Sequence, residues 1–234
     1  MHPILFHAGP YPVFSYGVFI TLGLIVLYAI ALVPARRAGW EWEQLLPIAS
    51  GVLVGGVCGM RLSHVVVEPD RFVELLDFYS GATGNIIGLV VGGYLGGTVV
   101  QKSLGYPAMG NYYAPAMAAT SVVWRIGCTL GGCCYGQETG LPWAVHLAGA
   151  DRHPTMVYEG LFNLLLLGVL WRLRRRVTGD NDLLYLYFAC YALFRFWLEF
   201  IRLYPPVLLG LTGIQVLCLG GLVWQGVYWR QRRV

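Results

Sequence analysis

The sequence predicts an all-α integral membrane protein with seven transmembrane helices, its N-terminus outside and its C-terminus in the cytoplasm. Composition is the first observation behind this prediction. Of the 234 residues, 57% are hydrophobic and only 12% are charged, whereas a soluble domain has about 25% charged residues. The mean hydropathy is +0.60. So few polar residues cannot cover a water-exposed surface, which excludes a soluble domain, a disordered chain and a nucleic-acid-binding protein.

The second observation is the number of long apolar stretches. A helix needs about 20 mainly apolar residues to cross the hydrocarbon layer. The first such stretch, 13–33, contains no charged residue. The six others are 44–67, 85–100, 112–135, 155–171, 183–201 and 207–229. The connections between them are short, so we predict a single transmembrane domain over 1–234.

The third observation is the distribution of arginine and lysine, which favour cytoplasmic loops. The first ten residues lack the basic segment of a cleavable signal, so we expect the first span to be retained. With the N-terminus outside, the external segments contain only three basic residues of this kind, Arg71, Arg152 and Arg202. The cytoplasmic segments contain ten, Arg36, Arg37, Lys102, Arg172, Arg174, Arg175, Arg176, Arg230, Arg232 and Arg233.

The second and third spans contain the glycine-rich runs GVLVGGVCGM at 51–60 and GLVVGGYLGG at 88–97. Small residues at such spacing let membrane helices approach closely. A nucleotide-binding glycine turn would follow a strand, and no strand is predicted here. We therefore interpret both runs as helix-packing surfaces.

Ionisable residues inside the spans are the main candidates for a functional site. Inserting each of them into the membrane costs about 2.5–3.5 kcal/mol, so an ionisable residue inside a span indicates a functional role. The predicted topology places all of them in the outer half of the membrane. They are Arg61, Arg125, Glu159, Arg195 and Glu199, with Arg202 at the outer boundary.

Arg195, Glu199 and Arg202 are spaced i, i+4, i+7 and are predicted to share one helical face. They would either lock helices together as a buried ion pair or bind an anionic ligand. Four arginines against two glutamates favour an anion, and guanidinium groups match phosphate well. A lipid head group from the outer leaflet fits this chemistry. For Arg61 the alternative is a side chain that reaches the membrane surface.

The histidine and cysteine residues have competing interpretations. His153, before Pro154, is typical of a helix start. Cys128, Cys133 and Cys134 form a C-x4-CC pattern, which is not a standard zinc spacing. Small-residue helix packing explains these cysteines, and a disulfide or another functional thiol is the alternative. We expect neither a metal site nor a cofactor.

Several motifs occur together in one order along the whole chain. They are Tyr16-Gly17, RIGCTLGGCCYG at 125–136, HPTMVYE at 153–159, YALFRFWLEFIR at 191–202 and Gln215. In this combination the sequence resembles the prolipoprotein diacylglyceryl transferase family. The resemblance implies transfer of a diacylglyceryl group from phosphatidylglycerol to the lipobox cysteine of a prolipoprotein, with release of glycerol phosphate. It also implies a multi-pass protein of the bacterial cytoplasmic (inner) membrane, with its active site toward the outer leaflet.

The resemblance assigns roles to individual residues. The catalytic candidates are Tyr16, Arg125, Arg195 and Glu199. The substrate-binding candidates are Arg61, Asn85, Gly136, His153, Tyr158, Glu159, Tyr191 and Arg202. The implied partners are phosphatidylglycerol as donor, a prolipoprotein signal peptide with its lipobox as acceptor, and the surrounding membrane lipids.

Three positions depart from the family pattern. Asn85 stands where the family usually has a histidine, Cys128 where it has an asparagine, and Cys133 at an acidic position. With Asn85 unable to take a proton, Glu199 or His153 is the next candidate for the general base. Two alternative functions therefore remain, a transferase of the same fold with another acceptor, and a lipid or metal carrier. A carrier would place ionisable groups near the membrane midplane.

Overall fold

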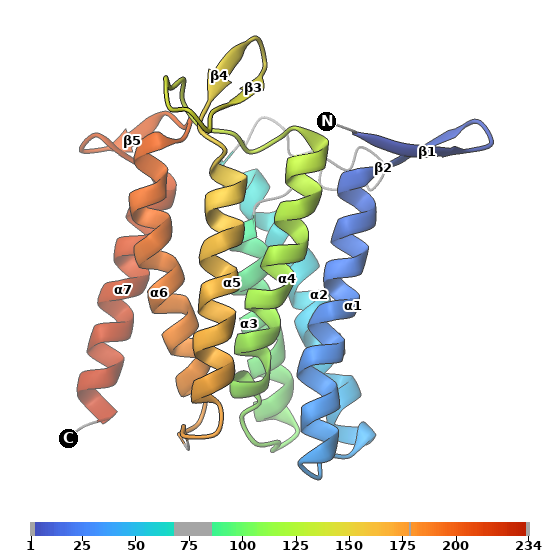
Figure 1. The fold of residues 1–234 in the computed structure, drawn as a ribbon. Coiled ribbons are helices and arrows are strands. Elements are labelled where there is room, and N and C mark those ends of the chain that lie inside the picture. Colours follow the sequence, from blue (N-terminus) through green and yellow to red (C-terminus); the bar gives the residue numbers. More distant parts are fainter. Residues whose placement is uncertain (1–2, 68–85, 178, 233–234) are drawn as a thin grey trace. The chain divides into compact units, whose positions relative to one another are not determined.

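The computed structural model describes residues 3–67, 86–177 and 179–232, and these residues are mostly helical (Figure 1). They divide into two compact units, Met1–Ala31 with Met109–Val234, and Leu32–Ala108. The α-helices of the described residues are α1 Ser15–Arg37, α2 Trp42–Val67, α3 Ile86–Ser103, α4 Gly110–Gly131, α5 Thr155–Leu173, α6 Asp182–Leu198 and α7 Gly213–Arg232.

Four helical segments are long and apolar enough to cross a membrane. They are Ser15–Arg37, Trp42–Ser63, Thr155–Leu173 and Asp182–Ile201. These segments confirm the membrane character that the composition predicts. The count of seven spans and the orientation of the termini remain predictions.

The predicted end of the fourth span, residue 135, is wrong. Helix α4 ends at Gly131 because Gly132 adopts the left-handed conformation, with φ of 68°. The backbone N–H of Cys133 then donates to the carbonyl of Cys128 at 3.1 Å. This six-to-one bond is the Schellman motif, which terminates helices at a glycine.

The predicted start of the seventh span, residue 207, is also wrong. Residues 206–208 and 211–212 pair as a hairpin, and α7 begins at Gly213. Thr212 Oγ1 accepts a hydrogen bond from the Gln215 N–H at 3.3 Å, and Gln215 Oε1 accepts one from the Thr212 N–H at 2.9 Å. This reciprocal pair is a capping box, so it fixes the first turn of α7.

Three short antiparallel hairpins correct the all-α prediction. They lie at one end of the larger unit (Figure 1). Two of their turns, Ala148-Gly149 and Leu209-Gly210, have positive φ at both central residues, as a type I′ turn requires. The strand pairs are β1 Ile4–Ala8 with β2 Tyr11–Phe14, β3 Val145–Leu147 with β4 Ala150–Arg152, and β5 Pro206–Leu208 with β6 Leu211–Thr212.

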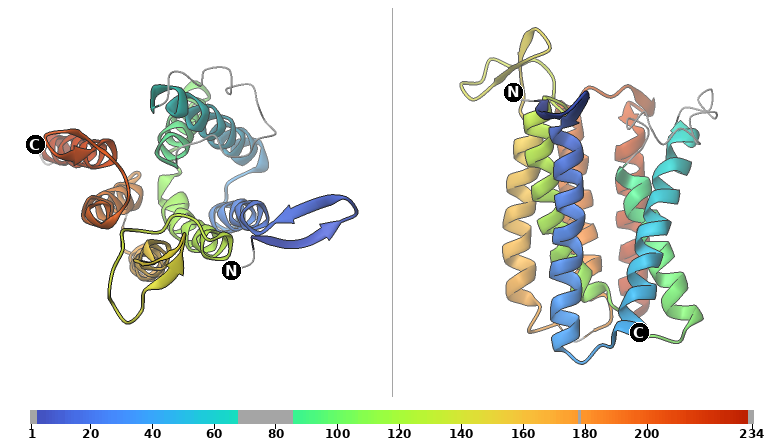
Figure 2. Two further views of the ribbon diagram at one scale, coloured as in Figure 1. Left: turned by 90° about the horizontal axis from the view of Figure 1, so that it is seen from above. Right: turned by 90° about the vertical axis from the view of Figure 1, so that its right-hand side faces the viewer.

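In the larger unit α4 lies beside α1 and α5, and α6 lies beside α7 (Figure 2). Two polar side chains of α4 bond to the backbone of α1. Thr120 Oγ1 donates to the Gly23 carbonyl at 3.1 Å, and Trp124 Nε1 donates to the Ile20 carbonyl at 3.2 Å. These bonds fix the register of α1 against α4.

In the smaller unit α2 and α3 pack against each other through glycine. A Cβ atom at Gly55 would lie 2.4 Å from the Gly92 carbonyl oxygen, and one at Gly59 would lie 2.2 Å from that of Gly88. Such distances leave no room for a side chain. The structure therefore confirms that the two glycine-rich runs form a helix-packing surface.

We expect Gly92→Ala to destabilise the protein by about 1–3 kcal/mol, as overpacking does. The added Cβ would lie 2.2 Å from the Gly55 carbonyl oxygen and 2.8 Å from the Gly59 Cα, so α2 and α3 must separate. Thermal unfolding of the detergent-purified variant measures the effect. The matched control is Gly168→Ala in α5, where the added Cβ has no atom within 4 Å. Equal unfolding temperatures for the two variants would contradict the prediction.

Candidate active site

Glu159, on the first turns of α5, is the centre of a buried ionic cluster. Its side chain is fully buried. Oε1 pairs with Arg125 Nη2 from α4 and accepts a hydrogen bond from the Tyr191 hydroxyl of α6 at 2.5 Å. Oε2 lies 3.5 Å from Arg195 Nη1 and 3.9 Å from Arg202 Nη1. The carboxylate of Glu159 therefore connects α5 to α4, to α6 and to the segment after α6.

Glu199 is the second buried carboxylate of the cluster. Arg195 Nη2 lies 2.9 Å from Glu199 Oε2, which confirms that these two residues share a helical face. Thr212 Oγ1 donates a hydrogen bond to Glu199 Oε1 at 3.1 Å. Helix α6 continues as a 3₁₀ turn, η2 Glu199–Ile201, and Arg202 that follows is extended. The chain direction after the 3₁₀ turn, not helical spacing, therefore sets the position of Arg202.

Thr212 joins the start of α7 to this cluster, so we expect Thr212→Val to destabilise the protein by about 1–2 kcal/mol, as lost N-caps do. The variant removes both the capping bond to Gln215 and the bond to Glu199. Thr212→Ser keeps the hydroxyl and is the matched control, expected close to wild type. Thermal unfolding of both variants measures the difference, and an equally stable Thr212→Val protein would contradict the assignment.

The cluster carries a surplus of positive charge and of hydrogen-bond donors. Arg125, Arg195 and Arg202 are buried with two glutamates, which leaves one net positive charge. Within the described residues, Arg195 Nη1 and Arg202 Nε and Nη1 are buried without a hydrogen-bond partner. Buried donors usually find an acceptor, so an anion at this position would satisfy them. Glu159 Oε2 and Glu199 Oε2 are likewise buried without a hydrogen-bond partner, so the surplus of positive charge, more than the number of donors, indicates an anion.

Gly136 allows three chain segments to meet beside the cluster. Its N–H donates to the His153 carbonyl at 2.9 Å, and the next N–H, of Gln137, donates to the Ile201 carbonyl at 2.8 Å. A Cβ at Gly136 would lie 2.4 Å from the Ile201 carbonyl oxygen. The glycine is therefore needed for this close backbone approach.

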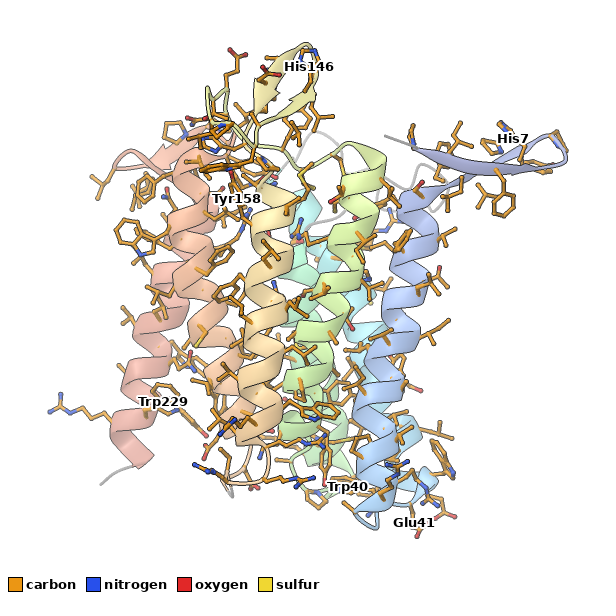
Figure 3. The ribbon with its side chains drawn as sticks, in the orientation of Figure 1. His7, Trp40, Glu41, His146, Tyr158 and Trp229 are labelled. Carbon is orange, nitrogen blue, oxygen red and sulfur yellow. The ribbon has the colours of Figure 1, made fainter. Side chains whose placement is uncertain are left out.

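Tyr158 lies in the first turn of α5, below the β3–β4 hairpin (Figure 3). His153 precedes Thr155, the first residue of α5, by two positions. His153 Nδ1 lies 3.4 Å from the Tyr158 hydroxyl, which also accepts a hydrogen bond from Trp143 Nε1 at 2.8 Å. The N-cap of α5 is Pro154, and no side chain caps the helix there. The side chain of His153 therefore does not act as a helix cap.

The three thiols of the RIGCTLGGCCYG motif at 125–136 come together at the end of α4. The Sγ atoms of Cys128, Cys133 and Cys134 lie within 4.8 Å of one another, and Arg125 Nη1 lies 3.8 Å from Cys128 Sγ. All three are free thiols. Hydrogen bonds from the other two thiols, together with the charges of Arg125 and Arg202, lower the pKa of the Cys134 thiol despite its burial.

The remaining predicted site residues are placed less directly. Tyr16 is on the first turn of α1, close to Gly127 of α4, and interacts electrostatically with Arg125. Arg61 is on α2, in the smaller unit, and Asn85 lies outside the described residues. The roles of these residues stay predictions.

Thr212 is a residue of the site that was not predicted from the sequence. The signal for it is the T-x-x-Q spacing of Thr212 and Gln215, which is the pattern of a capping box. A second such residue is Gln137, whose Nε2 donates to the carbonyls of Phe200 at 3.3 Å and Arg202 at 3.2 Å. The only feature of the sequence that could have indicated Gln137 is its position directly after the RIGCTLGGCCYG motif.

These features define a helical membrane protein with a buried, arginine-rich site suited to an anion. Tyr158 and Trp229 lie at opposite ends of the larger unit (Figure 3), as aromatic residues do at membrane surfaces. The family model for prolipoprotein diacylglyceryl transferase matches residues 3–230. The chain belongs to this family.

Curated relatives that this chain resembles are named phosphatidylglycerol–prolipoprotein diacylglyceryl transferase. One from Gloeobacter violaceus is 29% identical over 256 residues, which cover 99% of this chain and 93% of the relative. One from Clostridium tetani is 26% identical over 215 residues, 86% of each protein. One from Frankia alni is 29% identical and covers 84% of this chain, which spans 57% of that relative's length.

Proposed function

We infer that this chain is a transferase that moves a diacylglyceryl group from phosphatidylglycerol to a prolipoprotein. Membership of the family and the names of the relatives support this activity. The structural observation that carries it is the buried cluster of three arginines against two glutamates, in which Arg195 Nη1 and Arg202 Nε and Nη1 have no hydrogen-bond partner. A phosphodiester head group supplies acceptor oxygens for such donors. These observations favour the transferase over a lipid or metal carrier.

The acceptor in this proposal is the lipobox cysteine of the prolipoprotein signal peptide. Its thiolate attacks the glyceryl carbon that carries the phosphate ester, so a C–S bond forms and the C–O bond breaks. The electron pair of that bond goes to the phosphate oxygen, and glycerol phosphate leaves with one more negative charge than the phosphodiester had. Buried cations aimed at this oxygen stabilise the developing charge, which is the role we assign to Arg125, Arg195 and Arg202.

The acceptor thiol must lose its proton before it attacks. Of the two candidate bases, Glu199 is held by Arg195 Nη2 at 2.9 Å and by the Thr212 hydroxyl. Both oxygens of this carboxylate are therefore already engaged within the protein. His153 is half-buried and lies outside these ion pairs, beside the Tyr158 hydroxyl. We therefore propose His153 as the base.

The proposed orientation puts this site toward the outer leaflet of the bacterial cytoplasmic membrane. Glu159 is near the start of α5, whereas Arg172, Arg174, Arg175 and Arg176 are at its other end. Arg36 and Arg37 likewise close α1. Because arginine favours the cytoplasmic side, the start of α5 and the ionic cluster would face outward.

Incubation of the purified protein with labelled phosphatidylglycerol and a lipobox peptide tests this function. We expect a mass increase of one diacylglyceryl group on the peptide cysteine, and none on a matched peptide in which serine replaces that cysteine. The departures at Asn85, Cys128 and Cys133 favour one other candidate, a transferase of the same fold with a different acceptor. Binding of the labelled lipid without peptide modification would support that candidate and contradict the first.

A further inference from the structure

Helix termination explains why Cys128 and Cys133 are close together. In the Schellman motif at the end of α4, Cys128 is the third residue from the helix end and Cys133 follows the capping Gly132. Side chains at these two positions contact each other in such motifs. A short distance between the side chains of Cys128 and Cys133 is therefore ordinary for this turn, and by itself it does not indicate a binding site.

Cys134 is not explained by the motif. It has φ of 62°, a left-handed conformation that costs a residue with a Cβ about 1–2 kcal/mol. This conformation turns the chain so that its Sγ joins the other two within 4.8 Å. The carbonyl of Cys134 also accepts a hydrogen bond from Thr155 Oγ1, which ties the turn to the start of α5. A strained residue held by the surrounding structure is typical of a functional site.

The separation of the three sulfur atoms suits a small thiophilic ion. Tetrahedral thiolate ligands with Zn–S bonds of about 2.3 Å place their sulfur atoms about 3.8 Å apart. The three Sγ atoms lie within 4.8 Å of one another, so each pair would have to approach by at most about 1 Å to reach this separation. Among the described residues, no histidine or carboxylate joins them within the same distance. Three protein ligands with one position left open is the arrangement of catalytic, not structural, zinc sites.

We propose that Cys128, Cys133 and Cys134 bind one Zn²⁺ as thiolates, with the fourth position open to an exogenous thiol. The C-x4-CC spacing did not predict this site, because residues five and six positions apart do not share a helical face. The Schellman turn and the left-handed Cys134 bring the three thiols together instead.

The charges around the thiols fit this assignment. Three thiolates and one Zn²⁺ carry a net charge of −1, and the neighbouring ionic cluster carries a surplus of +1. Arg125 belongs to that cluster and lies 3.8 Å from Cys128 Sγ.

The open position gives the metal a role in the reaction, and this part rests on the proposed function. The lipobox thiol would lose its proton to solvent or a base on binding and become the fourth ligand. Its sulfur then forms the C–S bond to the glyceryl carbon as the C–O bond breaks and the phosphate oxygen takes the electron pair. Zinc neither gains nor loses electrons. Arg125, adjacent to both Cys128 and Glu159, would link thiol binding to phosphate binding.

Metal content tests the site without any activity assay. We expect protein purified under reducing, anaerobic conditions and loaded with Zn²⁺ to retain about one equivalent after desalting. Cys133→Ser and Cys134→Ser should each lose it, while Cys190→Ser, a half-buried thiol of α6 away from the cluster, should keep it. Loss of the metal from the Cys190 variant as well, or no retained zinc in the wild type, would overturn the proposal. A disulfide between any of the three thiols in the native protein, detected as a mass lower by two hydrogen atoms, would overturn it too.

A spectroscopic probe tests the open position. In protein loaded with Co²⁺, we expect thiolate charge-transfer bands that change when the lipobox peptide is added and do not change with the serine peptide. Bands that are the same with both peptides would overturn the role in acceptor binding. If diacylglyceryl transfer proceeds at an unchanged rate in Cys133→Ser, the zinc inference fails and the proposed function stands. If the metal binds but no peptide is lipidated, the site stands and the proposed function fails.

Discussion

Replacing Arg125 with alanine is expected to lower the rate of diacylglyceryl transfer by about 10²–10³-fold, the usual loss when one preorganised charge at a reacting anion is removed. Arg125 is buried, pairs with Glu159 and lies 3.8 Å from Cys128 Sγ. It therefore connects the carboxylate at the centre of the cluster to the thiols. Initial rates with labelled phosphatidylglycerol and a lipobox peptide measure the loss.

The same variant is expected to fold. Without Arg125 the cluster keeps Arg195 and Arg202 against Glu159 and Glu199, so its charges balance. Size-exclusion chromatography and thermal unfolding in detergent check this point. The matched control is Arg174→Ala at the other end of α5, expected to retain wild-type rates because Arg174 is half-buried against Trp171, on which it stacks, and lies outside the ionic cluster. A folded Arg125→Ala protein with full activity would contradict the phosphate-binding role.

Arg125→Lys distinguishes charge from geometry. Lysine keeps the positive charge but cannot offer two parallel N–H donors to a phosphate. An intermediate rate is expected if both features matter. A wild-type rate would mean that charge alone accounts for the effect of Arg125.

Features that depend on local spacing were predictable from the sequence. The i, i+4 spacing of Arg195 and Glu199 gave their ion pair, and the glycine runs gave the close approach of α2 and α3. Both follow from the periodicity of a single helix. Membrane character followed from composition, because polar residues are too few to cover a soluble surface.

Features that depend on several segments were not predictable in the same way. Glu159 was identified as one ionisable residue among six, but its central position depends on partners from α4, α6 and the segment after α6. The thiol cluster depends on a left-handed Cys134, which residue spacing does not reveal.

The two wrong span boundaries have one physical cause. Hydropathy does not distinguish an apolar helix from the apolar turns and strands beside it, and residues 132–135 and 206–212 are such segments. Capping signals do make the distinction. Gly132 is the left-handed residue of a Schellman motif, and Thr212 with Gln215 forms a capping box. Helix ends in apolar chains are therefore better read from caps than from hydropathy.

Glu159→Gln is expected to destabilise the protein by about 3–5 kcal/mol, as when one partner of a buried ion pair is removed. It leaves Arg125, Arg195 and Arg202 buried against Glu199 alone. The amide keeps the shape of the side chain, so the loss reflects charge rather than a cavity. The expected result is a large drop in unfolding temperature or loss of folded protein on size-exclusion chromatography.

The matched control is Glu138→Gln. Its carboxylate pairs with Arg152 at 3.1 Å, but its side chain is 69% exposed, and exposed pairs contribute about 0–1 kcal/mol. Adding Arg125→Gln to Glu159→Gln removes one of the two uncompensated positive charges and should restore part of the lost stability, since residues in one ionic network are energetically coupled. If Glu159→Gln is as stable as Glu138→Gln, or if the double variant is less stable than Glu159→Gln, then Glu159 does not hold the three arginines together.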